Sequence, residues 1–345
     1  MPDSIAPMPR ASRQRDAAFS ATTEVDVVQL ARELRAGQRR ALAKAITLVE
    51  STRPEHQAQA QALLHGLLPH TGHSIRIGIS GVPGVGKSTF IEALGVYLID
   101  AGHRVAVLAV DPSSALSGGS ILGDKTRMES LSQRTEAFIR PSPAAGNLGG
   151  VAEHTREALL LCEAAGFDVI IVETVGVGQS ETAVAGMTDV FVLLQLPNAG
   201  DDLQAIKKGI MELADLVVFN KADIDPTAAQ LAAAQMRSAL TMLRHTSPNW
   251  QPPVLTLSAT KKEGIDAFWK IIEDFRDTLS ASGEFAARRR HQAVDWMWQL
   301  IDAGLRQRFR AHPEVNARLE RFAAAVAAGD MTPTAAAREL LARAS

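Results

Sequence analysis

A glycine-rich octapeptide at residues 81–88, GVPGVGKS, narrows the possible folds of this 345-residue chain more than any other segment. It matches the pattern G-x-x-x-x-G-K-S/T and stands between an apolar segment and a helical one, the context that a phosphate-binding loop requires. Glycines let backbone N–H groups curl around phosphates, and the start of the next helix adds oriented donors. We therefore expect Lys87 to reach the β- and γ-phosphates and Ser88 to ligate Mg²⁺. The residues expected to surround the phosphates are Gly81, Val82, Pro83, Gly84, Val85, Gly86, Lys87, Ser88 and Thr89.

Short apolar segments alternate with helical ones on both sides of this loop. Each segment is rich in Val, Ile and Leu and is bounded by Gly, Pro, Asp or Asn, which is typical of strands covered on both faces. The expected strands are Arg76–Ser80, Val105–Val110, Asp168–Glu173, Val190–Leu196, Leu216–Asn220 and Pro253–Ser258. The expected helices include Lys87–Ala101, Val151–Ala165 and Asp202–Leu213. These β-α units predict an α/β fold of the P-loop NTPase type, with a mostly parallel sheet flanked by helices and ligands at the carboxyl ends of the strands.

The two ends of the chain carry helical patterns without strands. We expect residues 1–24 to be a disordered tail, 25–72 an N-terminal helical region interrupted at Gly37, 73–283 the domain with the phosphate loop, and 284–345 a C-terminal helical region. One helical stripe in the last region comprises Val294, Trp298, Ile301, Leu305 and Phe309. This stripe either packs against the core or forms a subunit interface, where aromatic residues are enriched. A last helix is expected to begin near Thr332 and Pro333.

Composition excludes several classes of protein. A net charge of −2 and a pI near 6.5 argue against a nucleic-acid binder. The run Arg288–His291 is accordingly interpreted as a solvated helix face, with phosphate contact as the alternative. Cys162, the one cysteine, indicates a reducing compartment and a buried structural thiol. No apolar run approaches ~18 residues, and the first 24 residues lack a secretory signal. We expect a cytoplasmic protein without a membrane partner, or a mitochondrial matrix protein in a eukaryotic host.

Acidic residues follow two of the expected strands and one glycine-rich loop. Glu173 ends its strand and precedes Gly176, whose backbone N–H is placed for the γ-phosphate. Many P-loop proteins carry Asp where this chain has Glu, so Glu173 is expected to reach Mg²⁺ through water or at a different angle. Asp111 is interpreted as a second carboxylate on the metal side, with an Asx turn as the alternative. Asp124 is expected to serve the metal from a first switch loop, or else to cap a helix.

Hydrolysis of a nucleotide requires a positioned water molecule. Many small GTPases place a glutamine directly after the switch glycine, but here Val177 stands there and Gln179 follows two residues later. We therefore predict slow intrinsic turnover that a partner or dimer contacts would raise. The residues expected to act in hydrolysis are Lys87, Asp124, Glu173 and Gln179.

A base-reading motif, Asn220-Lys221-Ala222-Asp223, follows the fifth expected strand. The carboxylate of Asp223 can accept hydrogen bonds from N1–H and the exocyclic amine of guanine. Adenine offers a lone pair at N1 instead and would leave Asp223 unpaired. Lys221 can lie over the base, Asn220 can brace the site, and Ser258-Ala259 can offer a backbone N–H to the guanine carbonyl. The motif therefore predicts a GTP-specific, Mg²⁺-dependent hydrolase.

Three longer segments resemble one known family. Residues 173–181, ETVGVGQSE, are similar to the second switch of the MeaB/MMAA GTPases, also known as ArgK. Residues 118–128, GGSILGDKTRM, resemble their first switch, and residues 201–211 resemble a further mobile segment called switch III. The likeness extends from about Val25 to the C-terminus. One departure is Asn198, where relatives are expected to carry glycine, a change that would alter the backbone freedom of switch III.

The resemblance implies a GTPase of the SIMIBI class that forms a homodimer through a C-terminal arm. It also implies a chaperone of an adenosylcobalamin-dependent acyl-CoA mutase, which gates cobalamin loading and protects or reactivates the mutase. Asp111, Asp124 and Glu173 would then serve the metal. Lys207 and Lys208 would belong to the mobile segment that responds to the mutase, or else to a solvated helix face.

Two other functions stay open from the residues. A metallochaperone GTPase serving another metalloenzyme would be expected to carry His or Cys clusters, whereas this chain has one cysteine and scattered histidines. An ArgK-like kinase would need an acceptor pocket with a general base, which no segment clearly marks.

Overall fold

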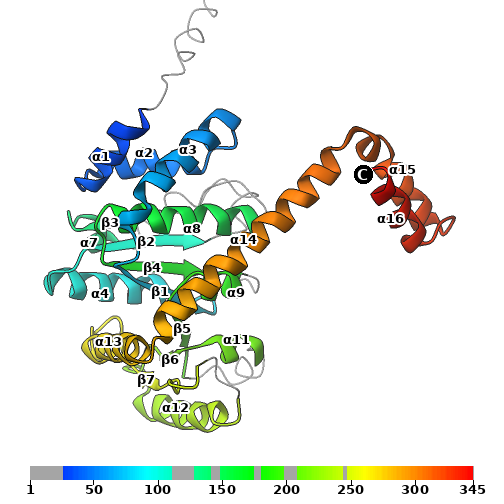
Figure 1. The fold of residues 1–345 in the computed structure, drawn as a ribbon. Helices are drawn as coiled ribbons and strands as arrows, with labels where there is room; N and C mark the ends of the chain where they lie inside the picture. The colour runs from blue at the N-terminus through cyan, green and yellow to red at the C-terminus, as the bar shows by residue number, and fades with distance from the viewer. Residues whose placement is uncertain are drawn as a thin grey trace, which may run out of the picture.

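The computed structural model describes residues 26–110, 128–140, 148–174, 180–197, 208–243 and 247–344. A seven-stranded sheet with the order β3-β2-β4-β1-β5-β6-β7 lies at its centre, and all neighbouring strands are parallel (Figure 1). The strands are β1 (Ile75–Gly81), β2 (Val105–Val110), β3 (Ala137–Arg140), β4 (Val169–Thr174), β5 (Val190–Gln195), β6 (Leu216–Phe219) and β7 (Val254–Thr256). The predicted P-loop NTPase class of fold is confirmed. Six strands fall within one or two residues of their predicted positions, and β3 was not predicted.

Hydrophobic residues on both faces of the sheet explain the continuous apolar strands. Along β4, Ile170 and Val172 belong to one buried cluster, whereas Val169 and Ile171 belong to the other. Helices α4 (Lys87–Asp100), α7 (Glu129–Ser132) and α13 (Ile265–Ala281) cover one face. Helices α8 (Leu148–Ala164), α9 (Ser180–Ala185), α11 (Lys208–Leu213) and α12 (Pro226–Leu240) cover the other. Cys162 is fully buried on the α8 side, and burial raises the pKa of its thiol, so its predicted structural role is confirmed.

The N-terminal helices form an outer layer against α8 (Figure 1). They are α1 (Val27–Arg35), α2 (Arg39–Val49), α3 (Pro54–Leu67) and the short 3₁₀ helix η1 (Leu68–His70). Gly37 has a φ of +73° between α1 and α2, which confirms the predicted interruption. Leu34, Leu42 and Leu63 pack into the same cluster as α8, and Glu50 pairs with Arg140 of β3. This layer is therefore continuous with the core of the sheet.

The C-terminal region consists of α14 (Glu284–Ala311), α15 (Pro313–Ala328) and α16 (Pro333–Ala342). The long helix α14 begins beside the sheet and carries α15 and α16 away from it (Figure 1). Thr332 caps α16 by accepting a hydrogen bond from the backbone N–H of Ala335, as predicted. Among the helices in the described ranges, none has the length and apolar character needed to cross a membrane. The proposed division into four domains remains a prediction, although α14 begins at its last boundary.

The hydrophobic stripe of α14 does not pack against the sheet. Val294, Trp298 and Leu305 have exposed fractions of 51%, 57% and 58%, and Ile301 is exposed as well. None of the residues of α14 is buried. Of the two interpretations of the stripe, packing against the core is therefore not supported by this structure, and a subunit interface remains.

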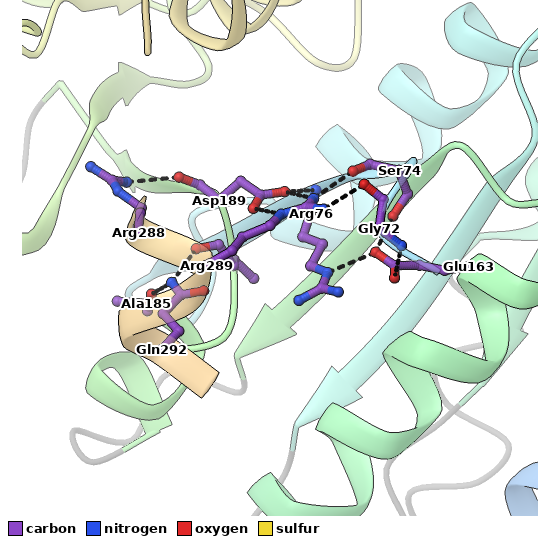
Figure 2. A network of polar contacts seen from close by, with 10 residues as sticks. Gly72, Ser74, Arg76, Glu163, Ala185, Asp189, Arg288, Arg289 and Gln292 are labelled. Atoms are coloured by element: carbon purple, nitrogen blue, oxygen red, sulfur yellow. Dashed lines mark hydrogen bonds and ion pairs between the residues drawn. The ribbon is translucent and has the colours of Figure 1, made fainter. Parts of the chain in front are cut away.

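The basic run at the start of α14 corrects a sequence-based interpretation. A solvated face was expected, but the side chains of Arg288 and Arg289 are only 19% and 16% exposed. Arg288 forms two hydrogen bonds with the carboxylate of Asp215, at 2.9 and 3.0 Å. Arg289 binds both carboxylate oxygens of Asp189 at 2.6 Å, and Figure 2 shows both arginines directed at Asp189. Because these aspartates precede β6 and β5, the ion pairs anchor α14 to the amino edge of the sheet.

Candidate nucleotide-binding site

The segments predicted to bind nucleotide meet at the carboxyl edge of the sheet. Residues 81–88 connect β1 to α4, and Glu173 lies at the end of β4 beside it. Residues 220–223 follow β6, and residues 258–259 follow β7. Parallel strands bring these loops to one edge although they lie far apart in the chain. Hydrogen bonds join these segments directly.

Asn220 holds the phosphate loop and the segment after β7 together. Its Nδ2 donates to the backbone oxygen of Val85 at 2.9 Å, while its Oδ1 accepts from the N–H groups of Lys221 and Ala259 at 2.8 and 3.1 Å. Gly86 has a φ of +94°, and a Cβ there would lie 2.7 Å from Nδ2 of Asn220. Glycine is therefore required at this position both by the backbone conformation and by the close approach of Asn220.

Lys221 also contacts the phosphate loop. Its Nζ donates to the backbone oxygen of Gly84 at 2.8 Å. Its φ of +60° is unusual for a residue with a Cβ, and such strained conformations are concentrated at functional sites. The base-reading motif and the phosphate loop therefore form one hydrogen-bonded unit.

Lys87 is buried inside the phosphate loop. Only 8% of the residue is exposed, and its Nζ donates to the backbone oxygens of Gly81 and Val82 at 2.7 and 3.3 Å. Burial lowers the pKa of this ammonium group below its ordinary value, whereas the carboxylates of Glu173 and Glu181 act in the opposite direction. A desolvated cation enclosed by a glycine-rich loop fits a polyphosphate, whose negative charge would offset the cost of burial.

Two oxygen donors suitable for a cation lie side by side. The hydroxyl of Ser88 donates to Oε1 of Glu173 at 3.3 Å, and Glu173 is 8% exposed. Thr174 is buried and donates to the hydroxyl of Ser80 at 3.0 Å, which fixes the end of β4 against β1. Within the described ranges no group of three or more His, Cys, Asp and Glu side chains could hold a metal. The pair of Ser88 and Glu173 nevertheless fits Mg²⁺, which commonly binds one or two protein oxygens together with substrate phosphates.

Asp223 stands beyond the loop, at the position predicted for the guanine base. The hydroxyl of Ser258 donates to its carboxylate and lowers the pKa of Asp223, so this group is held as an ionised acceptor. The N–H of Ser258 donates to Glu263, and that of Ala259 donates to Asn220. Both backbone donors predicted for the guanine carbonyl are thus engaged within the protein, and their contact with the base remains a prediction.

Glu181 is a residue of this site that the sequence reasoning did not assign. It lies in the first turn of α9, it is 5% exposed, and its charge acts on Lys87. Glu181 is the last residue of the segment that resembles the second switch, and an acid at the start of the next helix was the available signal. The charge balance around Lys87 therefore involves two buried carboxylates, and one of them belongs to α9.

Several predicted residues lie outside the described ranges. These are Asp111, Asp124, Gly176, Gln179, Asn198 and Lys207. Lys208 is the first residue of α11. Their proposed roles remain predictions.

The fold and this cluster of loops define a P-loop GTPase. Residues 42–314 match the family model described as methylmalonyl Co-A mutase-associated GTPase MeaB. The chain belongs to the MeaB family, and it hydrolyses GTP as a member of that family of GTPases.

Comparisons with individual proteins agree with this assignment. A putative GTPase of Caulobacter vibrioides is 56% identical over 318 residues, which cover 92% of this chain and 98% of the relative. The GTPase ArgK of Escherichia coli is 49% identical over a match that covers 92% of this chain and 96% of the relative. The mouse protein named methylmalonic aciduria type A homolog, mitochondrial, is 49% identical over a match that covers 88% of this chain and 76% of the relative. A crystal structure of a protein described as a LAO/AO transport system kinase is 42% identical with a TM-score of 0.76, covering 93% of this chain and 98% of that one.

Proposed function

We propose that this GTPase gates cobalamin loading into an adenosylcobalamin-dependent acyl-CoA mutase and protects or reactivates that mutase. The observation that carries the proposal is the match to the mutase-associated family across residues 42–314. This range includes most of the N-terminal helices, the whole sheet and all of α14. The name of the mouse relative, which refers to methylmalonic aciduria, supports the same class of client.

The proposal is tested with the full-length protein and the acyl-CoA mutase of the same host. We expect the GTPase to slow the loss of mutase activity during turnover, and we expect this effect to differ between GDP and a non-hydrolysable GTP analogue. Lys87→Met is the matched control, because it removes one phosphate contact and leaves the surface of the protein unchanged. Equal inactivation rates with and without the GTPase would contradict a mutase chaperone. Transfer of the γ-phosphate to a protein or amino acid would instead favour a kinase, the activity for which one structurally similar relative is named.

We propose Mg²⁺ as the cofactor of hydrolysis, held by Ser88 and Glu173 together with Asp111 and Asp124. The adjacency of the Ser88 hydroxyl and the Glu173 carboxylate supports this assignment. The ion would neutralise charge on the β- and γ-phosphates. Lys87 binds the same phosphates from the loop side, while Gly176 and Gln179 are proposed to contact the γ-phosphate and the attacking water.

We also propose a homodimer in which α14 of each subunit supplies the interface. The exposed stripe of Val294, Trp298, Ile301 and Leu305 supports it, because a contiguous apolar face rarely stays in water. In the cluster of α15 and α16, Val315 and Leu340 are buried, so this end of the arm has a small core of its own. The arm therefore leaves an apolar helix face available to a second copy.

Replacing Trp298 with aspartate is expected to convert the dimer into a monomer. Because Trp298 is exposed in the isolated subunit, the substitution should change the stability of the monomer by no more than about 0.5 kcal/mol. Sedimentation velocity measures the mass, with Gln299→Asp as a control that places the same charge on a neighbouring exposed position of α14. A wild-type monomer at micromolar concentration, or a Trp298→Asp variant that remains a dimer, would contradict this interface.

A further inference from the structure

The short helix α9 is held at its carboxyl end by side chains from two other helices. Arg156 of α8 donates through Nη2 to the backbone oxygen of Gly186 at 2.8 Å. Gln292 of α14 donates through Nε2 to the backbone oxygens of Thr188 at 2.8 Å and Ala185 at 3.4 Å. Figure 2 shows Gln292 on α14 directed at Ala185. The end of α9 is therefore bonded directly to the base of the arm.

Arg156 is an unusual residue to find at this junction. Its Nη1 donates to the backbone oxygen of Gln292 at 3.4 Å, and its guanidinium lies 4.7 Å from the centre of the Trp296 ring. Burial lowers its pKa to about 10, Arg76 acts in the same direction, and Asp295 opposes them. Its Nε has no hydrogen-bond partner among the described residues. Arg156 is a partly buried cation held by carbonyl groups and a ring, and its desolvation costs more than that of an apolar side chain, which argues for a role beyond packing.

The other end of α9 lies at the nucleotide site. The helix begins at Ser180, shortly after β4 ends at Thr174, and Glu173 of β4 bonds to Ser88 of the phosphate loop. Glu181 is buried in the first turn of α9, and its charge acts on Lys87. When a triphosphate binds at Lys87, its negative charge attracts the lysine and repels the carboxylate of Glu181. The charge of the bound nucleotide would therefore act on the first turn of α9.

Tight packing makes α9 transmit such a change along its length. The helix lies against β1 at Gly78, where a Cβ would come within 2.8 Å of Val184 and 2.7 Å of the Thr188 hydroxyl. Six residues of helix measure only about 9 Å from end to end. A displacement at Glu181 therefore reaches the carbonyl groups that Arg156 and Gln292 bind.

The base of α14 contacts the end of α9 directly through Gln292. Arg288, Gln292 and Trp296 recur at intervals of four residues and share one face of the helix. Arg288 is anchored to Asp215 at the rigid edge of the sheet, whereas Gln292 and Trp296 contact α9 and Arg156 one and two turns further on. About 22 Å of helix continues beyond Trp296, so a small tilt at this point becomes a larger shift along the arm.

We propose that Arg156 and Gln292 are positioning residues that couple the nucleotide site to the arm through α9. In one direction, the bound nucleotide sets the contact between Arg156 and Trp296 and hence the tilt of α14. In the other direction, the arm holds α9 and thereby sets the position of the Glu181 charge that acts on Lys87, which influences hydrolysis. This coupling requires binding of the guanine nucleotide but not a mutase client.

Tryptophan fluorescence of the full-length protein tests the coupling. In a Trp298→Phe background, Trp296 is the only tryptophan of α14. Trp269 is a buried residue of α13, and Trp250 packs against Phe275 of the same helix. We expect the emission to differ between GDP and a non-hydrolysable GTP analogue. Gln292→Leu should abolish this difference and lower kcat about tenfold, while KM for GTP changes less than about twofold. Gln299→Leu makes the same chemical change at an exposed position of α14 and should leave both readouts as in the parent.

Two further variants keep the proposal falsifiable without relying on Gln292. Trp296→Phe should remove the nucleotide-dependent signal and leave thermal unfolding unchanged. Arg156→Lys, which keeps the charge and one donor, should retain part of the signal, whereas Arg156→Met should lose it. A parent protein whose emission is identical in the two nucleotides would overturn the coupling. The same conclusion follows if Gln292→Leu retains both the full signal and the parental kcat.

Discussion

Replacing Lys87 with methionine is expected to reduce GTP hydrolysis by at least about 100-fold, the usual loss when one donor to the transition-state charge is removed. The Nζ of Lys87 is enclosed by the loop that ends at Gly86, and we propose that it is the cation that binds the phosphates. Methionine fills a similar volume without a charge. The measurement is phosphate release under single-turnover conditions with saturating GTP and Mg²⁺.

Thermal unfolding supplies the control for the Lys87 variant. The ammonium group is desolvated, with carbonyl partners at 2.7 and 3.3 Å, so its removal should leave the unfolding temperature of the nucleotide-free protein unchanged or higher. A variant that unfolds much earlier than the wild type would indicate a structural role for Lys87. Hydrolysis within a few-fold of the wild-type rate would contradict its place in the phosphate site.

Replacing Asp223 with asparagine is expected to change the preferred base from guanine to xanthine. Asp223 offers two acceptor oxygens, which match N1–H and the exocyclic amine of guanine. Asparagine offers one acceptor and one donor, and xanthine carries a carbonyl where guanine has its amine. We expect the affinity for GDP to fall on the order of 10³-fold and the affinity for XDP to rise by a similar factor. Competition against a fluorescent nucleotide measures both constants.

Asp225 provides a matched control two residues away. Its carboxylate caps α12 by accepting from the N–H of Ala228 at 3.0 Å. Asparagine caps a helix about as well as aspartate, so Asp225→Asn should preserve both the fold and the preference for GDP. If the Asp223 variant still prefers GDP, or if it binds neither base, the proposed role of Asp223 in reading the base is wrong.

The sheet was predictable from the sequence wherever strands are buried on both faces. Val105–Val110 is apolar throughout, is bounded by polar residues, and was placed correctly to the residue. Ala137–Arg140 was missed because this edge strand has only four residues and its last two are half-buried. This segment has neither a long apolar run nor a clear alternation of apolar and polar residues. Its pairing with β2 depends on contacts that form only in the folded chain.

The phosphate loop and the base-reading motif were recognisable because their chemistry is local. Gly86 and Lys87 lie next to each other, and the backbone conformation that the loop needs is encoded in the glycines themselves. Asn220 and Val85 are 135 residues apart in the chain. Their contact could be predicted only by placing both residues at the same edge of the sheet.

Charged residues were the hardest to interpret from the sequence. Arg289 looks like part of a solvated basic run, yet its partner Asp189 lies 100 residues earlier. No sequence pattern indicated the contacts of Arg156, because its partners are backbone carbonyl groups and the ring of Trp296. Pattern alone does not show which charges will be buried, since burial depends on elements that meet only in the folded chain.

Calorimetric titration of the wild-type protein with GDP and with ADP, at equal Mg²⁺, tests the central claim most directly. Asn220 and Lys221 bond to the phosphate loop, and the carboxylate of Asp223, whose pKa is lowered, is proposed to read the base. The predicted result is binding of GDP at least about 10³-fold tighter than binding of ADP. Comparable affinities for the two nucleotides would contradict it.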